Sequence, residues 1–221
     1  MMMHLLMPAI CWLGSHAAVP TPADTLTVPP LAQAPILDGH VTEREYGAPA
    51  LQVVTAAGAV RVWLGRQGGY VYLAAVIPDS SFYWGDDFVV SLDPHGRGGP
   101  QPDAGDRQWY LRRVLDSSVV RLLTAADSGR WWASGQAPPT LGTTRHHADW
   151  DIASTSSMSG WTVELRIRES VVKPGTSAPR MALRTYNDRP HGWWSWPVAP
   201  PSLAAHGVER APALWIPLRL P

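Results

Sequence analysis

Proline and glycine divide this sequence into segments too short for long helices. The 221 residues include 22 Pro and 19 Gly, which lie between short runs of apolar and β-branched side chains. Proline removes a hydrogen bond from a helix interior, and glycine lowers helix stability. Short apolar runs bounded by such turn residues are typical of strands. The sequence therefore predicts an all-β fold: an antiparallel β-sandwich, jelly-roll-like or immunoglobulin-like in its two sheets, with few or no long helices.

The predicted strands are continuous apolar runs or alternations of apolar and polar residues. The strands over 60–64 and 70–76 form a hairpin, because glycines stand at the turn between them. A short strand opens the domain at Pro35 and closes in a turn at Asp38 and Gly39. Further strands are expected at 88–92, 106–114, 119–124, 161–167, 181–186 and 214–220, with an aromatic cluster at 193–196.

Residues 84–94, with the sequence WGDDFVVSLDP, form the stretch around which we expect the chain to be organised. The apolar run 88–92 predicts a buried strand. Trp84 stands just before two carboxylates, Asp86 and Asp87. An indole ring beside hydrogen-bond acceptors suits a ligand site, because it combines apolar area with polar recognition. The alternative is that Trp84 packs in the core.

The N-terminus resembles a secretory signal. An apolar stretch over 5–13 precedes small residues at Ser15 and Ala17, so residues 1–17 are interpreted as a signal peptide. Residues 18–34 are rich in Pro, Ala and Thr and predict a linker before a domain over 35–221. We therefore expect a secreted or periplasmic protein. No later segment reaches the roughly 18 to 20 apolar residues that a membrane span requires.

Composition and the absence of certain motifs argue against several classes of function. Cys11 is the only cysteine and lies inside the expected signal peptide, so disulfide and cysteine-nucleophile chemistry are not expected. Lys plus Arg and Asp plus Glu both number 18, and this zero net charge gives no reason to expect a nucleic acid partner. The sequence has no Gly-x-Ser-x-Gly elbow, phosphate-binding loop or dinucleotide fingerprint. We expect a protein that is not an enzyme.

Several pieces in fixed order resemble family 9 carbohydrate-binding modules, which are related to the dopamine β-monooxygenase N-terminal-like (DOMON-like) sandwich domains. The pieces are Ile36-Leu37-Asp38-Gly39, Pro78-Asp79, Gly85-Asp86-Asp87, Leu92-Asp93-Pro94, Asp106-Arg107-Gln108, Gly160-Trp161-Thr162-Val163-Glu164 and Tyr186-Asn187-Asp188. The resemblance covers roughly 35–221. It implies a β-sandwich that binds a mono- or oligosaccharide without catalysis, alone or beside an extracellular protein partner.

The resemblance also implies the site. The family holds a sugar between two tryptophans and binds its hydroxyls with polar side chains. The corresponding residues here are Trp84, Asp86, Gln108, Arg112, Arg184, Asn187 and, as the second tryptophan, Trp194. A register shift of one residue would replace Arg112 by Tyr110 or Arg113. No cofactor is required, although structural calcium is plausible, with Asp38 or Asp79 as ligands.

Three alternatives remain. Some relatives in the wider group carry a haem held by Met and His or Lys, which makes Met158 and Met181 with His146, His147, His191 or His206 candidate axial ligands. Residues 146–151, HHADWD, could form a hydrolytic metal site, but adjacent His residues on a strand face opposite ways, so a solvated loop is expected. Lastly, the sandwich could lack a ligand and act in protein contacts.

Overall fold

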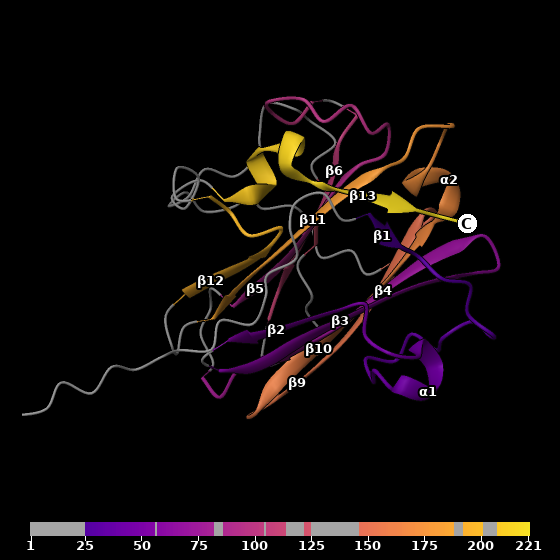
Figure 1. Ribbon diagram of the computed structural model, residues 1–221. Helices are drawn as coiled ribbons and strands as arrows, with labels where there is room; N and C mark the ends of the chain where they lie inside the picture. The colour runs from indigo at the N-terminus through magenta and orange to yellow at the C-terminus, as the bar shows by residue number, and fades with distance from the viewer. Residues whose placement is uncertain are drawn as a thin grey trace, which may run out of the picture.

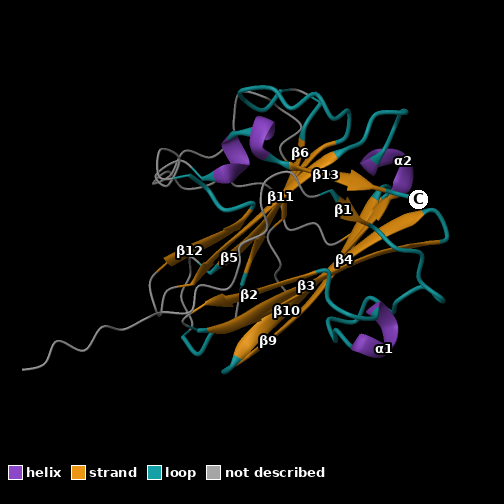
Figure 2. Ribbon diagram, viewed as in Figure 1, coloured by secondary structure: helices purple, strands orange, loops and turns teal. Residues whose placement is uncertain are grey.

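The protein folds into two β-sheets packed face to face, which confirms the predicted sandwich (Figure 1). The computed structural model describes residues 25–55, 57–81, 86–103, 105–113, 122–124, 146–187, 192–200 and 207–221. Within these ranges the helices are single turns, so strands make up nearly all the regular structure (Figure 2).

The first sheet, which we call the β5 sheet, has the order β1-β13-β11-β5-β6-β7, with β12 also paired to β11. Its strands are β1 (Leu26–Thr27), β5 (Asp87–Asp93), β6 (Arg107–Arg112), β7 (Leu122–Thr124), β11 (Arg180–Asn187), β12 (Gly192–Trp196) and β13 (Ile216–Arg219). All its described pairs are antiparallel except β1 with β13.

The second sheet, the β4 sheet, has the order β2-β3-β4-β10-β9-β8 and is antiparallel. Its strands are β2 (Leu51–Thr55), β3 (Gly58–Gln67), β4 (Tyr70–Pro78), β8 (His146–His147), β9 (Trp150–Ser157) and β10 (Gly160–Arg168). The helical turns are α1 (Glu43–Tyr46), α2 (Glu169–Val172) and the 3₁₀ turns η2 (Val208–Arg210) and η3 (Pro212–Leu214).

The main core lies between the sheets. Phe88, Val90 and Leu92 of β5 are fully buried and belong to one apolar cluster with side chains of both sheets. Alternate residues of a strand face opposite sides, so Asp87, Val89 and Ser91 lie on the other face of the β5 sheet. Burial of one side chain such as Phe88 contributes about 2 kcal/mol to folding. The core therefore fixes which face of β5 is polar.

Most predicted strands are present, with ends shifted by a few residues. The predicted hairpin is confirmed: β3 and β4 join at Gly68 and Gly69, whose φ angles of 58° and 80° favour glycine. The expected loop at 146–151 is wrong, because these residues form β8, a turn and the start of β9.

The N-terminal segment is part of the sandwich. Leu26 and Thr27 pair with β13, and Val28 is fully buried in the core. Residues 26–27 of the predicted linker therefore form the first strand of the fold, and Leu26 and Val28 pack in or against the main core. Residues 1–24, which include the predicted signal peptide, lie outside the described residues.

The predicted strand near Pro35 is absent from the described structure, where residues 36–41 have no regular secondary structure and the chain bends at Asp38 and Gly39. This segment lies on the outer face of the β4 sheet and is held by Glu164. The Glu164 carboxylate accepts the N–H groups of Asp38 at 3.1 Å and Gly39 at 2.6 Å and the Tyr46 hydroxyl at 2.7 Å. These bonds replace the strand pairing that the local sequence predicts.

Candidate functional site

Polar and aromatic side chains gather on the outer face of the β5 sheet. Strand pairing sets Val89 of β5 opposite Tyr110 of β6 and Arg184 of β11, and sets Ser195 of β12 opposite Arg184. Because alternate residues of a strand share a face, these registers show which polar and aromatic side chains lie together on the outer face. These are Asp87, Ser91, Gln108, Tyr110, Arg184, Tyr186, Trp193 and Ser195.

Trp193 is the most exposed of the described aromatic residues on this face. This residue is 41% exposed, although tryptophan usually lies mostly buried. Trp193 pairs across strands with Tyr186, and their ring centroids are 4.7 Å apart with planes tilted by 53°. The Cζ atom of Arg184 lies 3.4 Å from the centroid of the Trp193 ring. Two neighbours therefore hold the indole while part of its surface faces solvent.

Glu209 holds the Arg184 side chain in position. Arg184 is buried and forms an ion pair with Glu209 of η2. Burial raises the pKa of Glu209, and the Arg184 charge opposes that rise. Gly207 has a φ of 78°, and a side chain there would collide with both Arg184 and Glu209. The turn at Gly207 thus lets Glu209 reach Arg184 and hold it against Trp193.

Two further hydrogen-bonded pairs lie on the same face. The Tyr110 hydroxyl donates to the Asp87 carboxylate, and both residues are buried. The Gln108 side-chain amide donates to the Ser91 hydroxyl at 3.3 Å. Side chains that are already hydrogen-bonded and packed lose little further freedom when a ligand binds, so this part of the face is preorganised.

The predicted site residues fall into two groups. Gln108 and Arg184 lie on the outer face, together with Tyr110, which was the predicted substitute in a shifted register. The backbone of Arg112 pairs with Asp87, but its side chain is outside the described structure, as is the whole of Trp84.

The other group faces the interior. Trp194 is partly buried against the main core, on the side of β12 opposite Trp193. Asp86 is fully buried, and Asn187 donates to the Pro78 carbonyl at 3.1 Å. The sequence predicts Trp194, Asp86 and Asn187 as sugar-binding residues, but all three are directed away from the outer face. Each is the immediate neighbour of a residue that faces outward, and adjacent strand residues face opposite sides. The prediction missed Trp193, Tyr186, Asp87 and Glu209.

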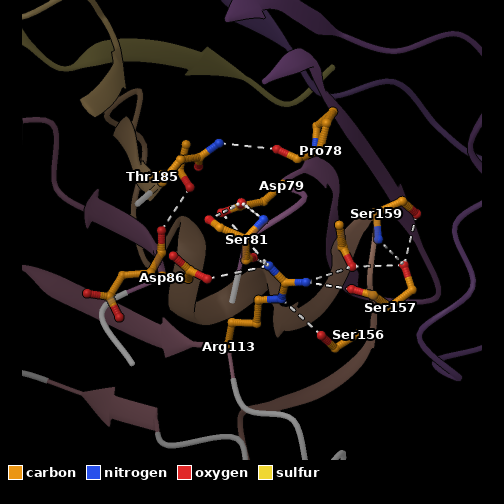
Figure 3. A network of polar contacts seen from close by, with 12 residues as sticks. Pro78, Asp79, Ser81, Asp86, Arg113, Ser156, Ser157, Ser159 and Thr185 are labelled. Carbon is orange, nitrogen blue, oxygen red and sulfur yellow. Dashed lines mark hydrogen bonds and ion pairs between the residues drawn. The ribbon is translucent and has the colours of Figure 1, made fainter. Parts of the chain in front are cut away.

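The two candidate calcium ligands, Asp38 and Asp79, have different surroundings. Asp38 is exposed, and its carboxylate accepts the His40 N–H at 2.8 Å. Asp79 is fully buried, accepts two hydrogen bonds from Ser81, and lies 3.8 Å from the Arg113 guanidinium (Figure 3). A cation adjacent to Asp79 makes the site unsuited to a metal ion. Among the described residues, no three His, Cys, Asp or Glu side chains form a group that could hold one.

The two methionines that were candidate haem ligands lie in different parts of the described structure. Met158 is 77% exposed at the turn between β9 and β10, whereas Met181 is fully buried in the core. His146 and His147 make up β8, and His191 and His206 lie outside the described ranges.

The described part of the chain contains no helix with the length and apolar character of a membrane span.

Comparison with known proteins identifies the fold. The sequence matches no protein-family model and no curated protein. The structure is similar to a family 9 carbohydrate-binding module from Caldicellulosiruptor kristjanssonii in complex with cellotriose. That match has a TM-score of 0.53 and 15% identity, and covers 89% of this chain and 93% of the module. For a family 9 module from the same organism in complex with glucose, the TM-score is 0.50 at 15% identity, with 90% and 96% covered. The chain therefore has the fold of a family 9 carbohydrate-binding module.

Proposed function

We propose that this protein is a non-catalytic domain that binds a mono- or oligosaccharide on the outer face of the β5 sheet. The fold supports this proposal, because the similar solved modules are in complex with cellotriose and with glucose. Fold alone does not define a function. The residues of the face supply the independent argument.

The exposed indole of Trp193 carries the proposal. A pyranose ring has an apolar face of C–H groups that stacks on an aromatic ring, and this contact removes apolar area of both rings from water. Arg184 and Tyr186 hold the Trp193 ring in place. In this proposal Trp193 takes the place of Trp194 as the second tryptophan that stacks on the sugar, and Trp84 is retained as the first.

Hydrogen bonds to the sugar would come from the polar groups around Trp193. Arg184 and Gln108 supply N–H donors, and the Tyr110 and Asp87 pair supplies a hydroxyl and a carboxylate. Sugar hydroxyls need both donors and acceptors, and buried, oriented groups of both kinds favour the hydroxyl pattern that they fit. Arg112 is retained as a further donor. We also propose that the domain acts outside the cytoplasm, alone or beside an extracellular protein partner.

Calorimetric titration with glucose, cellobiose, cellotriose and xylobiose tests the proposal. We expect saturable binding of at least one sugar, and a loss of at least about tenfold in affinity for Trp193→Ala, corresponding to about 1.4 kcal/mol. Trp193→Phe should retain part of the affinity. Val54→Ala, at an exposed apolar residue of the other sheet, is the matched control and should bind like the wild type.

Two results would contradict the proposal. One is the absence of binding to all four sugars by a folded protein. The other is binding that Trp193→Ala leaves unchanged. A visible absorption spectrum of the same sample tests the haem alternative, since haem gives an intense Soret band in the protein as purified.

A further inference from the structure

A buried arginine connects the two sheets at one end of the sandwich (Figure 3). Arg113 follows β6, and its side chain is 1% exposed. Its backbone N–H donates to the Asp86 carbonyl at 2.8 Å. Its guanidinium donates to acceptors of both sheets: Ser156 Oγ at 2.9 Å, Ser81 O at 2.6 Å, Ser157 O at 2.5 Å, Gly160 O at 3.5 Å and Asp86 Oδ2 at 3.4 Å. A guanidinium has five N–H donors, so this one is fully used.

Two carboxylates share this cation. Asp79 and Asp86 are fully buried, and their Oδ2 atoms lie 3.8 Å and 3.4 Å from Nη1 of Arg113. Asp79 also accepts the N–H and the hydroxyl of Ser81. Two carboxylates buried close together repel each other, and a buried charge without a partner is strongly unfavourable. This end of the sandwich therefore requires a cation.

The oxygen atoms around Arg113 are of the kind that calcium binds. Carboxylates, backbone carbonyls and a hydroxyl are hard oxygen donors, which Ca²⁺ prefers in sets of six to eight. Here the hydroxyl, the carbonyls and Asp86 accept hydrogen bonds from a guanidinium, and Asp79 forms an ion pair with it. We infer that Arg113 is the resident cation of this site and takes the place of a divalent metal ion, so that the sandwich folds without calcium.

Metal analysis and thermal unfolding of the wild-type protein provide the first test. We expect no stoichiometric calcium in the purified protein, and the same melting temperature in excess EDTA and in calcium at about 5 mM, above the dissociation constants of typical extracellular calcium sites. A stoichiometric metal ion, or a clear fall in melting temperature with EDTA, would overturn the inference.

Substitution of Arg113 provides the second test. Arg113→Ala leaves the two carboxylates without their cation, so its melting temperature should fall by about 10 °C. Calcium should then recover a measurable part of that fall, because the oxygen donors are freed. Arg113→Lys keeps a positive charge, so its melting temperature should fall by less and should not change when calcium is added.

Arg168→Ala is the control for the loss of an arginine. Arg168 is half exposed and pairs with Asp149 at the surface, so this variant should resemble the wild type with and without calcium. An Arg113→Ala protein whose melting temperature is unaffected by calcium would contradict the inference, as would a calcium response of Arg113→Lys. The wild-type measurement decides the question even if Arg113→Ala does not fold.

Discussion

Single residues decide which side of a strand carries the candidate site. Residues 192–196 read GWWSW, with an aromatic side chain on each face. Local sequence therefore cannot tell which tryptophan faces the core. Tertiary packing places Trp194 against the apolar cluster and leaves Trp193 outside. The same one-residue ambiguity separates Asp86 from Asp87, so the residue types of the site were predictable and their faces were not.

The buried pair of Arg184 and Glu209 gives a prediction at this scale. Glu209→Gln removes the carboxylate and leaves the Arg184 charge buried, so we expect the free energy of unfolding to fall by about 3 kcal/mol. Urea denaturation measures this. Glu169→Gln, in the partly exposed pair with Arg66, should change it by less than about 1 kcal/mol. Equal losses in the two variants would contradict the role given to burial.

Asp106 gives a prediction about pH. Burial is the largest cause that raises its pKa from 3.8 to about 6. A carboxyl group with a raised pKa in the folded state favours folding when protonated, so its ionisation lowers stability as pH rises from about 4 to 6. Asp106→Asn removes that cost and keeps an acceptor for the Asp103 N–H, which now bonds to Asp106 at 2.9 Å.

We therefore expect Asp106→Asn to be more stable than the wild type at pH 7.5, by about 1 kcal/mol, and to lose that advantage at pH 4. Urea denaturation at both pH values checks this. An advantage that is independent of pH would mean that ionisation of Asp106 is not the cause.

At the scale of elements, the strands that the sequence predicts well are those with a dense apolar run. Residues 88–92 and 161–167 became β5 and β10 because their apolar side chains fit between two sheets. The strand β9 was missed because its sequence, WDIASTSS, is polar and partly exposed. Its partner β10 supplies the pairing, and that information is not local.

The segment that Glu164 holds is also set by distant residues. Tyr46→Phe removes one donor to a buried carboxylate, so we expect a loss of about 1 to 2 kcal/mol in unfolding free energy. Hydrogen exchange at the amides of Asp38 and Gly39, which donate to Glu164, should become faster. Thr42→Ala, at an exposed hydrogen bond in the same segment, is the control. Unchanged exchange in Tyr46→Phe would show that Glu164 does not depend on Tyr46.

At the scale of the whole molecule, the sandwich begins before the predicted domain boundary. The predicted linker shows no strand periodicity, and its role becomes visible only when β13, almost the full length of the chain away, lies beside it. A chain that starts at residue 35 lacks β1 and the buried Val28.

We expect the chain starting at residue 35 to melt about 5 °C below one starting at residue 25, because it loses apolar contacts and the pairing of β13. Equal melting temperatures for the starts at 35 and 25 would mean that β1 adds nothing to stability.

The way in which β12 and β13 share one side of β11 has a consequence for self-association. β12 pairs with residues 183–187 of β11 and β13 with residues 180–181, while the two-residue β1 covers β13. Among the described residues, this margin of the sheet offers another chain only the five residues of β12 and the two of β1. Such short, divided edges are poor templates for strand addition, and this arrangement disfavours fibril growth from folded molecules.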